Sequence, residues 1–179
     1  MAPHIALHEI GAPFEGRPLS FARKEQREPA FLALNPDGKV PTLLVDGRPL
    51  TEVAAILFYL ARSFPEAKLL PDALEAEAQA VSWMSFAAAT LHAVRRQGGE
   101  ARGAAFALAE KKLGAREWAL GQYSIADIHL FRLYWRVRPL LGAAPGDMPA
   151  LEAHYARMMD RPAVKRTIAL ESAIGYELP

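Results

Sequence analysis

Short helix-like and strand-like patterns of apolar residues alternate over the first part of the chain. Residues 3–10 predict a short helix, because Pro3 suits its first turn and Gly11 suits the position after its end. Residues 14–21 predict a weaker strand, and residues 30–34 predict a helical turn that stops just before an Asn-Pro pair. Such alternation is typical of an α/β region.

Residues 35–61 hold the densest series of local signals. Val40-Pro41 leads into the apolar run of residues 42–45, which predicts a strand. Asp46-Gly47 then predicts a two-residue hairpin turn, since both central positions of a type I′ turn need positive φ. Residues 48–50 form the expected return strand.

A helix is expected directly after this hairpin. Thr51 is its predicted N-cap, and Ile56, Leu57 and Leu60 are among its apolar positions. Glu52 would then lie in the first turn. The hairpin and the helix N-terminus together present backbone groups and one carboxylate at a single point.

Only helical patterns follow residues 63–72, a segment with two prolines and no clear period. The five predicted helices cover residues 74–96, 101–113, 124–140, 149–159 and 162–170. Ser124 and Asp127 fit a capping box at the start of the third of these helices, so we expect them to be structural. The sequence therefore predicts an α/β domain at residues 1–71 and an all-helical domain at residues 73–179.

Charge and composition exclude several classes of function. The 179 residues include 21 basic and 20 acidic side chains, a net charge of +1, so no surplus of positive charge favours nucleic acid or an anionic membrane. There is no cysteine, which excludes disulfides, thiolate metal sites and a cysteine nucleophile within this chain. No apolar run is long enough for a membrane span, and the N-terminus does not resemble a signal peptide. We expect a cytoplasmic protein.

Five pieces of the sequence, in this order and spacing, resemble the glutathione transferase superfamily, most closely its bacterial beta-like members. They are APHIAL at 2–7, VP at 40–41, LTE with its apolar helix at 50–61, SIAD at 124–127 and RPAV at 161–164. The resemblance covers essentially the whole chain. It implies a thioredoxin-like N-terminal domain, an all-helical C-terminal domain and glutathione as co-substrate.

The resemblance also implies roles for residues around the hairpin. The bond before Pro41 would be cis, and the backbone of Val40 would pair with the cysteinyl part of glutathione. Glu52 would bind the γ-glutamyl amino group, and the γ-glutamyl carboxylate would lie at the N-terminus of the helix that follows Thr51. Val53 stands where relatives often have Ser or Gly, so it would offer only its backbone N–H.

Three more residues complete the implied site. Lys39 would add positive charge toward the glycyl end of glutathione. His92 matches a histidine that faces the active site in beta-like relatives. Ser85, seven residues earlier and so on the same helix face, matches an asparagine near the thiol. Structural readings stay open beside these: Pro41 as a requirement of the fold, Glu52 as a favourable acid in a first helical turn, and His92 as a structural histidine.

The sequence departs from the family in one major respect. Relatives have a first strand before the helix that begins here near Ala2, and this strand ends in the Ser, Cys or Tyr that activates the glutathione thiol. Neither is found in this sequence, so the catalytic residue is unknown, with His92 as a possible contributor. A misassigned start, a strand supplied by another chain and a rearranged domain that has lost binding are the three explanations. The region of residues 92–110 also looks shortened.

Two functions follow from these features. One is a glutathione transferase that conjugates glutathione to small hydrophobic electrophiles in detoxification, as a homodimer. The other is a non-catalytic glutathione-binding or protein-interaction relative with a degenerate site. His4 and His8 have a spacing that can bind a metal, but no third ligand is suggested, so no metal is expected.

Overall fold

A helix, α1 (Ala2–Ile10), opens the chain and becomes the centre of the molecule. The computed structural model describes residues 1–142 and 146–174, except for the side chain of Arg96. Pro3 lies in the first turn of α1, and Gly11 ends it in the left-handed conformation with φ 68°. Both features agree with the helix predicted from the sequence.

The segment from residue 12 to residue 20 is not a strand, so the strand predicted at 14–21 is wrong. No strand within the described residues pairs with it, and side-chain packing holds it instead. Phe14 stacks on His4 and packs edge-on against His8, with ring centroids 5.2 Å and 5.1 Å apart. A short 3₁₀ turn η1 (Glu25–Arg27) and helix α2 (Pro29–Leu32) follow, close to the turn predicted at 30–34.

The sheet in the described residues is a single antiparallel hairpin of β1 (Thr42–Val45) and β2 (Arg48–Thr51). Its register pairs Thr42 with Thr51 and Val45 with Arg48. Asp46 and Gly47 form the turn with φ of 51° and 77°, as the sequence predicts for a type I′ turn. Helix α3 (Val53–Ser63) follows directly, and a 3₁₀ turn η2 (Pro65–Ala67) begins the connection to the second half.

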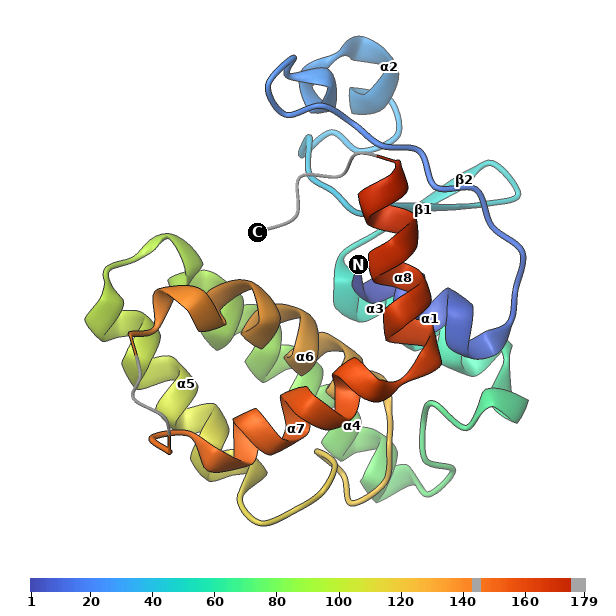
Figure 1. Ribbon diagram of the computed structural model, residues 1–179. Coiled ribbons are helices and arrows are strands. Elements are labelled where there is room, and N and C mark those ends of the chain that lie inside the picture. The colour runs from blue at the N-terminus through green and yellow to red at the C-terminus, as the bar shows by residue number, and fades with distance from the viewer. Residues whose placement is uncertain (143–145, 175–179) are drawn as a thin grey trace.

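Helices make up the regular structure of the second half as far as it is described (Figure 1). They are α4 (Leu74–Phe86), the π-helix η3 (Ala87–His92), the 3₁₀ turn η4 (Ala93–Arg96), α5 (Gly99–Leu113), α6 (Ile125–Val137) with its 3₁₀ end η5 (Arg138–Leu140), α7 (Pro149–Asp160) and α8 (Pro162–Ala173). The first of the five predicted helices is therefore not one regular α-helix. None of the described helices is both long and apolar enough to cross a membrane.

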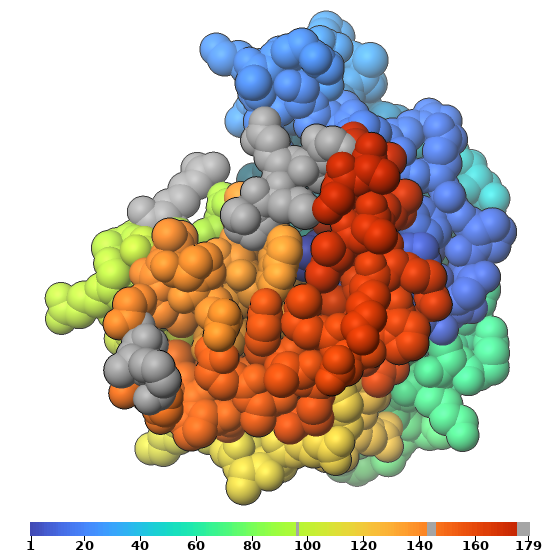
Figure 2. Space-filling view, in the orientation of Figure 1, coloured from blue at the N-terminus to red at the C-terminus, as the bar shows by residue number. Residues whose placement is uncertain are grey.

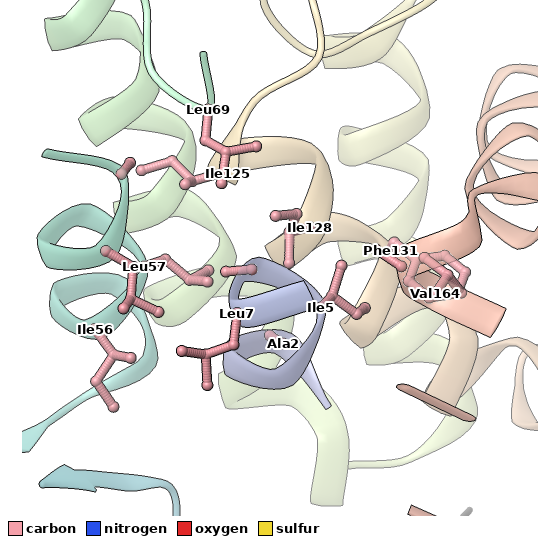
Figure 3. Close-up of a cluster of buried hydrophobic side chains, with 14 of the residues drawn as sticks. Ala2, Ile5, Leu7, Ile56, Leu57, Leu69, Ile125, Ile128, Phe131 and Val164 are labelled. Carbon is pink, nitrogen blue, oxygen red and sulfur yellow. The ribbon is translucent and has the colours of Figure 1, made fainter. Parts of the chain in front are cut away.

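One hydrophobic cluster joins the two halves of the chain. Figure 3 shows α1 between α3, which carries Ile56 and Leu57, and the helices α6 and α8, which carry Phe131 and Val164. These side chains are fully buried or nearly so. A second cluster lies within the helical half and includes residues of α4, α5, α6 and α7. The first cluster means that α1 and α3 pack on the helical half rather than on a core of their own.

Polar contacts fix α1 against α8, and Figure 2 shows α8 beside the N-terminal segment on the visible face. Arg161 donates two hydrogen bonds to the carboxylate of Glu9, at 2.7 Å and 3.1 Å. The hydroxyl of Tyr123 donates to the same carboxylate at 2.9 Å. The guanidinium of Arg161 also lies 3.5 Å from the centre of the Tyr123 ring. The RPAV motif thus supplies the cation that holds the first helix in place.

Candidate functional site

The peptide bond between Val40 and Pro41 is cis, as the resemblance implies. Val40 is 44% exposed. It lies before the first residue of β1, and its backbone N–H and C=O form no hydrogen bond with any other described residue. Extended backbone with free donor and acceptor groups can pair with a peptide-like ligand.

Asn35 fixes the loop that leads to this bond. Its side-chain amide donates to the carbonyl of Lys39 at 2.7 Å, and its carbonyl oxygen accepts from the N–H of Asp37 at 3.2 Å. Asn35 is 4% exposed. In the sequence, Asn35 was predicted only to end the helical turn at residues 30–34. The signal for its larger role is the Asn-Pro-Asp-Gly run, because asparagine side chains commonly bond to the backbone two residues onward in turns.

Glu52, not Thr51, is the N-cap of α3, so the predicted cap is wrong. Thr51 ends β2, where ladder pairing with Thr42 holds it in extended conformation. Glu52 adopts positive φ, at 66°, and this turns the chain from the strand into the helix. Its carboxylate is exposed, and it makes no hydrogen bond or ion pair with another described residue.

The N-terminus of α3 has no side-chain cap among the described residues. Its first intrahelical bond runs from the N–H of Ile56 to the carbonyl of Glu52. The N–H groups of Val53 and its two successors therefore have no helical partner and favour an anion. A free carboxylate beside free N–H groups suits a zwitterionic amino-acid group, whose ammonium and carboxylate need opposite partners.

The helical half contributes His92 and Ser85, both of which are exposed. His92 ends η3, and Ser85 lies in the last turn of α4. The interpretation that they share a face assumed a regular α-helix. The π-helix between them, with hydrogen bonds from i to i+5, breaks the seven-residue spacing on which this interpretation depended. π-helical turns occur frequently at functional sites.

His92 belongs to a group of cationic and imidazole side chains. We refer to this group as the basic cluster. Its members are His92, Arg95, His129, Arg132 and Arg136. They come from η3, η4 and α6, and η3 packs against α6. The sequence pattern gave Arg132 and Arg136 as one strip of a helix but could not indicate what they face.

Electrostatics link Glu52 to the basic cluster. Burial is the main cause that lowers the pKa of His92, and the charges of Arg132 and Arg95 lower it further, while Glu52 acts in the opposite direction. Glu52 is thus close enough to His92 to affect its pKa, although the two predicted site residues come from distant parts of the sequence.

Burial also lowers the pKa of two other members of the basic cluster, His129 and Arg132. It lowers the pKa of His129 to about 3, with smaller contributions from Arg132 and His92, so His129 is neutral at pH 7. It also lowers the pKa of Arg132 to about 10, with the positive charges of Arg136 and Arg95 adding to the effect. Arg132 therefore remains charged at neutral pH in surroundings that disfavour its charge.

The remaining predicted residues have weaker structural support. Lys39 is exposed, and its ammonium lies 3.7 Å from the carboxylate of Asp37. Nδ1 of His4 lies 2.8 Å from the carboxylate of Glu171 in α8. Within residues 1–142 and 146–174, no group of three His, Cys, Asp or Glu side chains could hold a metal ion.

Comparisons with known proteins match both parts of the chain to one family. Residues 1–62 match the family model described as the N-terminal domain of glutathione S-transferase, and residues 84–162 match the model of its C-terminal domain. The glutathione S-transferase GstA of Escherichia coli O157:H7 is 32% identical over 189 aligned residues, covering 96% of this chain and 93% of the relative.

Two further matches are an isomerase and a solved structure with bound glutathione. A maleylacetoacetate isomerase of Pseudomonas aeruginosa is 29% identical over 195 aligned residues, covering 89% of this chain and 92% of the relative. The crystal structure of a glutathione transferase homolog from Sulfitobacter, with bound glutathione, has a TM-score of 0.87 at 28% identity. That match covers 94% of this chain and 91% of the Sulfitobacter chain.

Proposed function

Because the chain belongs to the glutathione S-transferase superfamily, we propose that it binds glutathione beside the β1–β2 hairpin and conjugates it to a small electrophile. The observation that carries this proposal is the free carboxylate of Glu52 next to the uncapped N-terminus of α3. Related structures with bound glutathione support the choice of ligand.

In this proposal each part of glutathione has a partner on the chain. The backbone of Val40 pairs with the cysteinyl unit, and Glu52 binds the γ-glutamyl ammonium. The free N–H groups at the start of α3 bind the γ-glutamyl carboxylate. Lys39 adds charge toward the glycyl carboxylate. These contacts hold the tripeptide and fix where its sulfur lies.

The chemistry requires the glutathione sulfur as a thiolate. Positive charge near a thiol favours the thiolate and lowers the thiol pKa. The basic cluster supplies such charge. Glu52 is close enough to one of its members, His92, to affect the pKa of that imidazole. The thiolate then attacks the electrophilic carbon of the second substrate. The side chain that donates a hydrogen bond to the sulfur is not assigned, and His92 stays a candidate.

The proposal is tested by titrating glutathione into the wild-type protein and into Glu52→Ala by calorimetry. Loss of a charge-assisted contact of about 1.5–3 kcal/mol should weaken binding roughly 10-fold to 100-fold. Thermal stability should hardly change, because Glu52 has no partner within the described chain. The exposed Glu66 of η2 gives the matched control, Glu66→Ala, which should leave glutathione affinity unchanged.

The outcomes separate the candidate functions. Absence of glutathione binding by the wild-type protein would refute the site. An equal loss of affinity and stability in Glu52→Ala would make Glu52 structural. Binding without conjugation of a generic electrophile would support the non-catalytic relative over the enzyme.

The wider setting of the reaction also belongs to this proposal. We expect a cytoplasmic homodimer that acts on small electrophiles in detoxification. Sedimentation equilibrium measures the dimer directly, and a single species at the monomer mass of 19.6 kDa would contradict it.

A further inference from the structure

Arg132 is a partly buried cation with no counter-charge in contact. It forms no hydrogen bond or ion pair with any other described residue. The acid whose charge acts on it is Glu171, which lies beyond ion-pair distance. Glu171 is already engaged by Nδ1 of His4 at 2.8 Å and by the amino group of Met1. Burying a charge without a partner is costly, so proteins rarely retain one without a use.

The surroundings of Arg132 add positive charge instead of compensating it. Arg136 lies one turn further along α6 and, at i,i+4, on the same side of the helix. His129 lies one turn earlier and is 3% exposed, and within the described part of the chain its Nδ1 has no hydrogen-bond partner. His92 lies in η3, which packs against α6, and Glu52 is the acid whose charge acts on its pKa against the effect of the arginines.

In the glutathione site proposed above, Glu52 binds an ammonium and the start of α3 binds a carboxylate. Neither contact uses the basic cluster. The cations of α6 thus have no role in holding the γ-glutamyl group. His92 of η3 is close enough to Glu52 for its pKa to be affected, and η3 packs against α6, so this contact brings the cations of α6 toward the proposed glutathione site.

We propose that the second substrate carries a carboxylate, and that Arg132 and Arg136, with the buried Nδ1 of His129 beside them, form the subsite that binds it. This inference rests on the proposed function, since it places the carboxylate beside glutathione. The planar guanidinium fork of arginine suits a carboxylate, to which it can donate two parallel hydrogen bonds. The class of substrate is therefore a small electrophile with an acid group, such as an unsaturated acid.

The reaction of such a substrate balances without a further reactant. The thiolate sulfur bonds to the carbon β to an activating carbonyl. The electron pair of the carbon–carbon π bond moves to the α carbon, which takes a proton from water. The thiol proton has passed to solvent beforehand, so the sum is addition of S–H across the double bond. Arg132 and Arg136 orient the acid group and do not take part in the bond changes.

The test uses three ligands and calorimetry on the full chain, so it does not depend on turnover. They are glutathione, S-(4-carboxybenzyl)glutathione and S-(4-carbamoylbenzyl)glutathione, of which the last two differ in charge and hardly in shape. The wild-type protein should bind the carboxylate at least about 10-fold more tightly than the amide. In Arg132→Gln the preference should fall to within about twofold, whereas the affinity for the amide, which has no thiol to ionise, should hardly change.

Two further variants keep the result specific. Arg136→Gln should also reduce the preference. Lys111→Gln removes the same unit of charge from an exposed position on α5 and should keep the preference intact. Thermal melts confirm that each variant is folded before titration.

Each other outcome decides against the inference in a recognisable way. Glutathione binding without a carboxylate preference would overturn this inference and leave the proposed function standing. Equal weakening of all three ligands in Arg132→Gln would mean that the cluster binds a carboxylate of glutathione itself, which also overturns it. No binding of glutathione by the wild-type protein would overturn both.

Discussion

The first turn of α6 and its middle carry buried polar groups under opposite conditions. In the first turn, the carboxylate of Asp127 accepts from the N–H of Ser124 at 2.9 Å, the hydroxyl of Ser124 at 3.1 Å and the N–H of Ala119 at 2.8 Å. Nε2 of His154 lies 3.1 Å from the same carboxylate, whereas Nδ1 of that ring has no hydrogen-bond partner among the residues that the structure describes. Five residues after Asp127, Arg132 has no such partner among the described residues, and Nδ1 of the buried His129, on the same helix, has none either.

This is the difference expected between a polar group that supports the fold and one that, in the inference above, binds a ligand. Fully satisfied buried networks rigidify a structure, whereas unsatisfied buried polar groups cost stability. Both kinds of polar group lie close together on α6, so burial alone does not distinguish them. They differ in whether they have hydrogen-bond partners within the protein.

The largest effect is expected from breaking the satisfied network. Asp127→Ala leaves two backbone N–H groups and His154 without their acceptor, so the free energy of unfolding should fall by about 3–5 kcal/mol. Urea denaturation measures this change. Asp160→Ala, at a carboxylate with 88% exposure and one distant lysine, is the control and should stay within about 0.5 kcal/mol of the wild type. A loss below about 1 kcal/mol in Asp127→Ala would remove the contrast.

The satisfied network is also the part that the sequence predicted best. Ser124 and Asp127 were read as a capping box from spacing alone, and the structure confirms it. The Asp46-Gly47 turn was predictable for the same reason, because local backbone requirements select those residues. The partners His154 and Ala119 could not be predicted, since they come from other elements.

Where the sequence analysis failed, tertiary packing decided. The apolar residues at 14–21 suit a strand, but a strand needs a ladder partner, and packing of Phe14 on α1 took its place. Ladder pairing also kept Thr51 in β2 and moved the cap of α3 to Glu52. Arg132 and Arg136 share one strip of α6 at i,i+4, but this spacing does not indicate which element they face. Only the packing of η3 against α6 turns this strip into the basic cluster.

A medium effect is expected from acid, through His129. Its pKa is about 3 in the folded protein against 6.5 in the unfolded chain, so between these values the unfolded state binds more protons. Stability should therefore fall as pH drops from 6.5 toward 3, by about 2 kcal/mol at pH 5. In His129→Leu the part of the loss that comes from this imidazole, about 2 kcal/mol at pH 5, should disappear, as followed by urea denaturation at pH 7 and pH 5.

His92 provides the matched control for that experiment. Its pKa is lowered by the same main cause, burial, but its side chain is exposed at the end of η3. His92→Leu should therefore change the slope between pH 7 and pH 5 much less than His129→Leu. An equal change in both variants would show that the acid sensitivity does not come from the buried imidazole.

The smallest effect, and the most specific, is expected from removing the unpaired cation. Arg132→Met keeps much of the side-chain volume and eliminates an uncompensated buried charge, so the free energy of unfolding should rise by about 1 kcal/mol. Arg138→Met is the matched control, because Arg138 donates two hydrogen bonds of 2.8 Å to Glu152 and packs on the Tyr155 ring. Its loss should lower stability by about 0.5–1 kcal/mol. Opposite signs in urea denaturation would support the distinction between the two arginines, whereas destabilisation by both would place Arg132 among the residues that hold the fold.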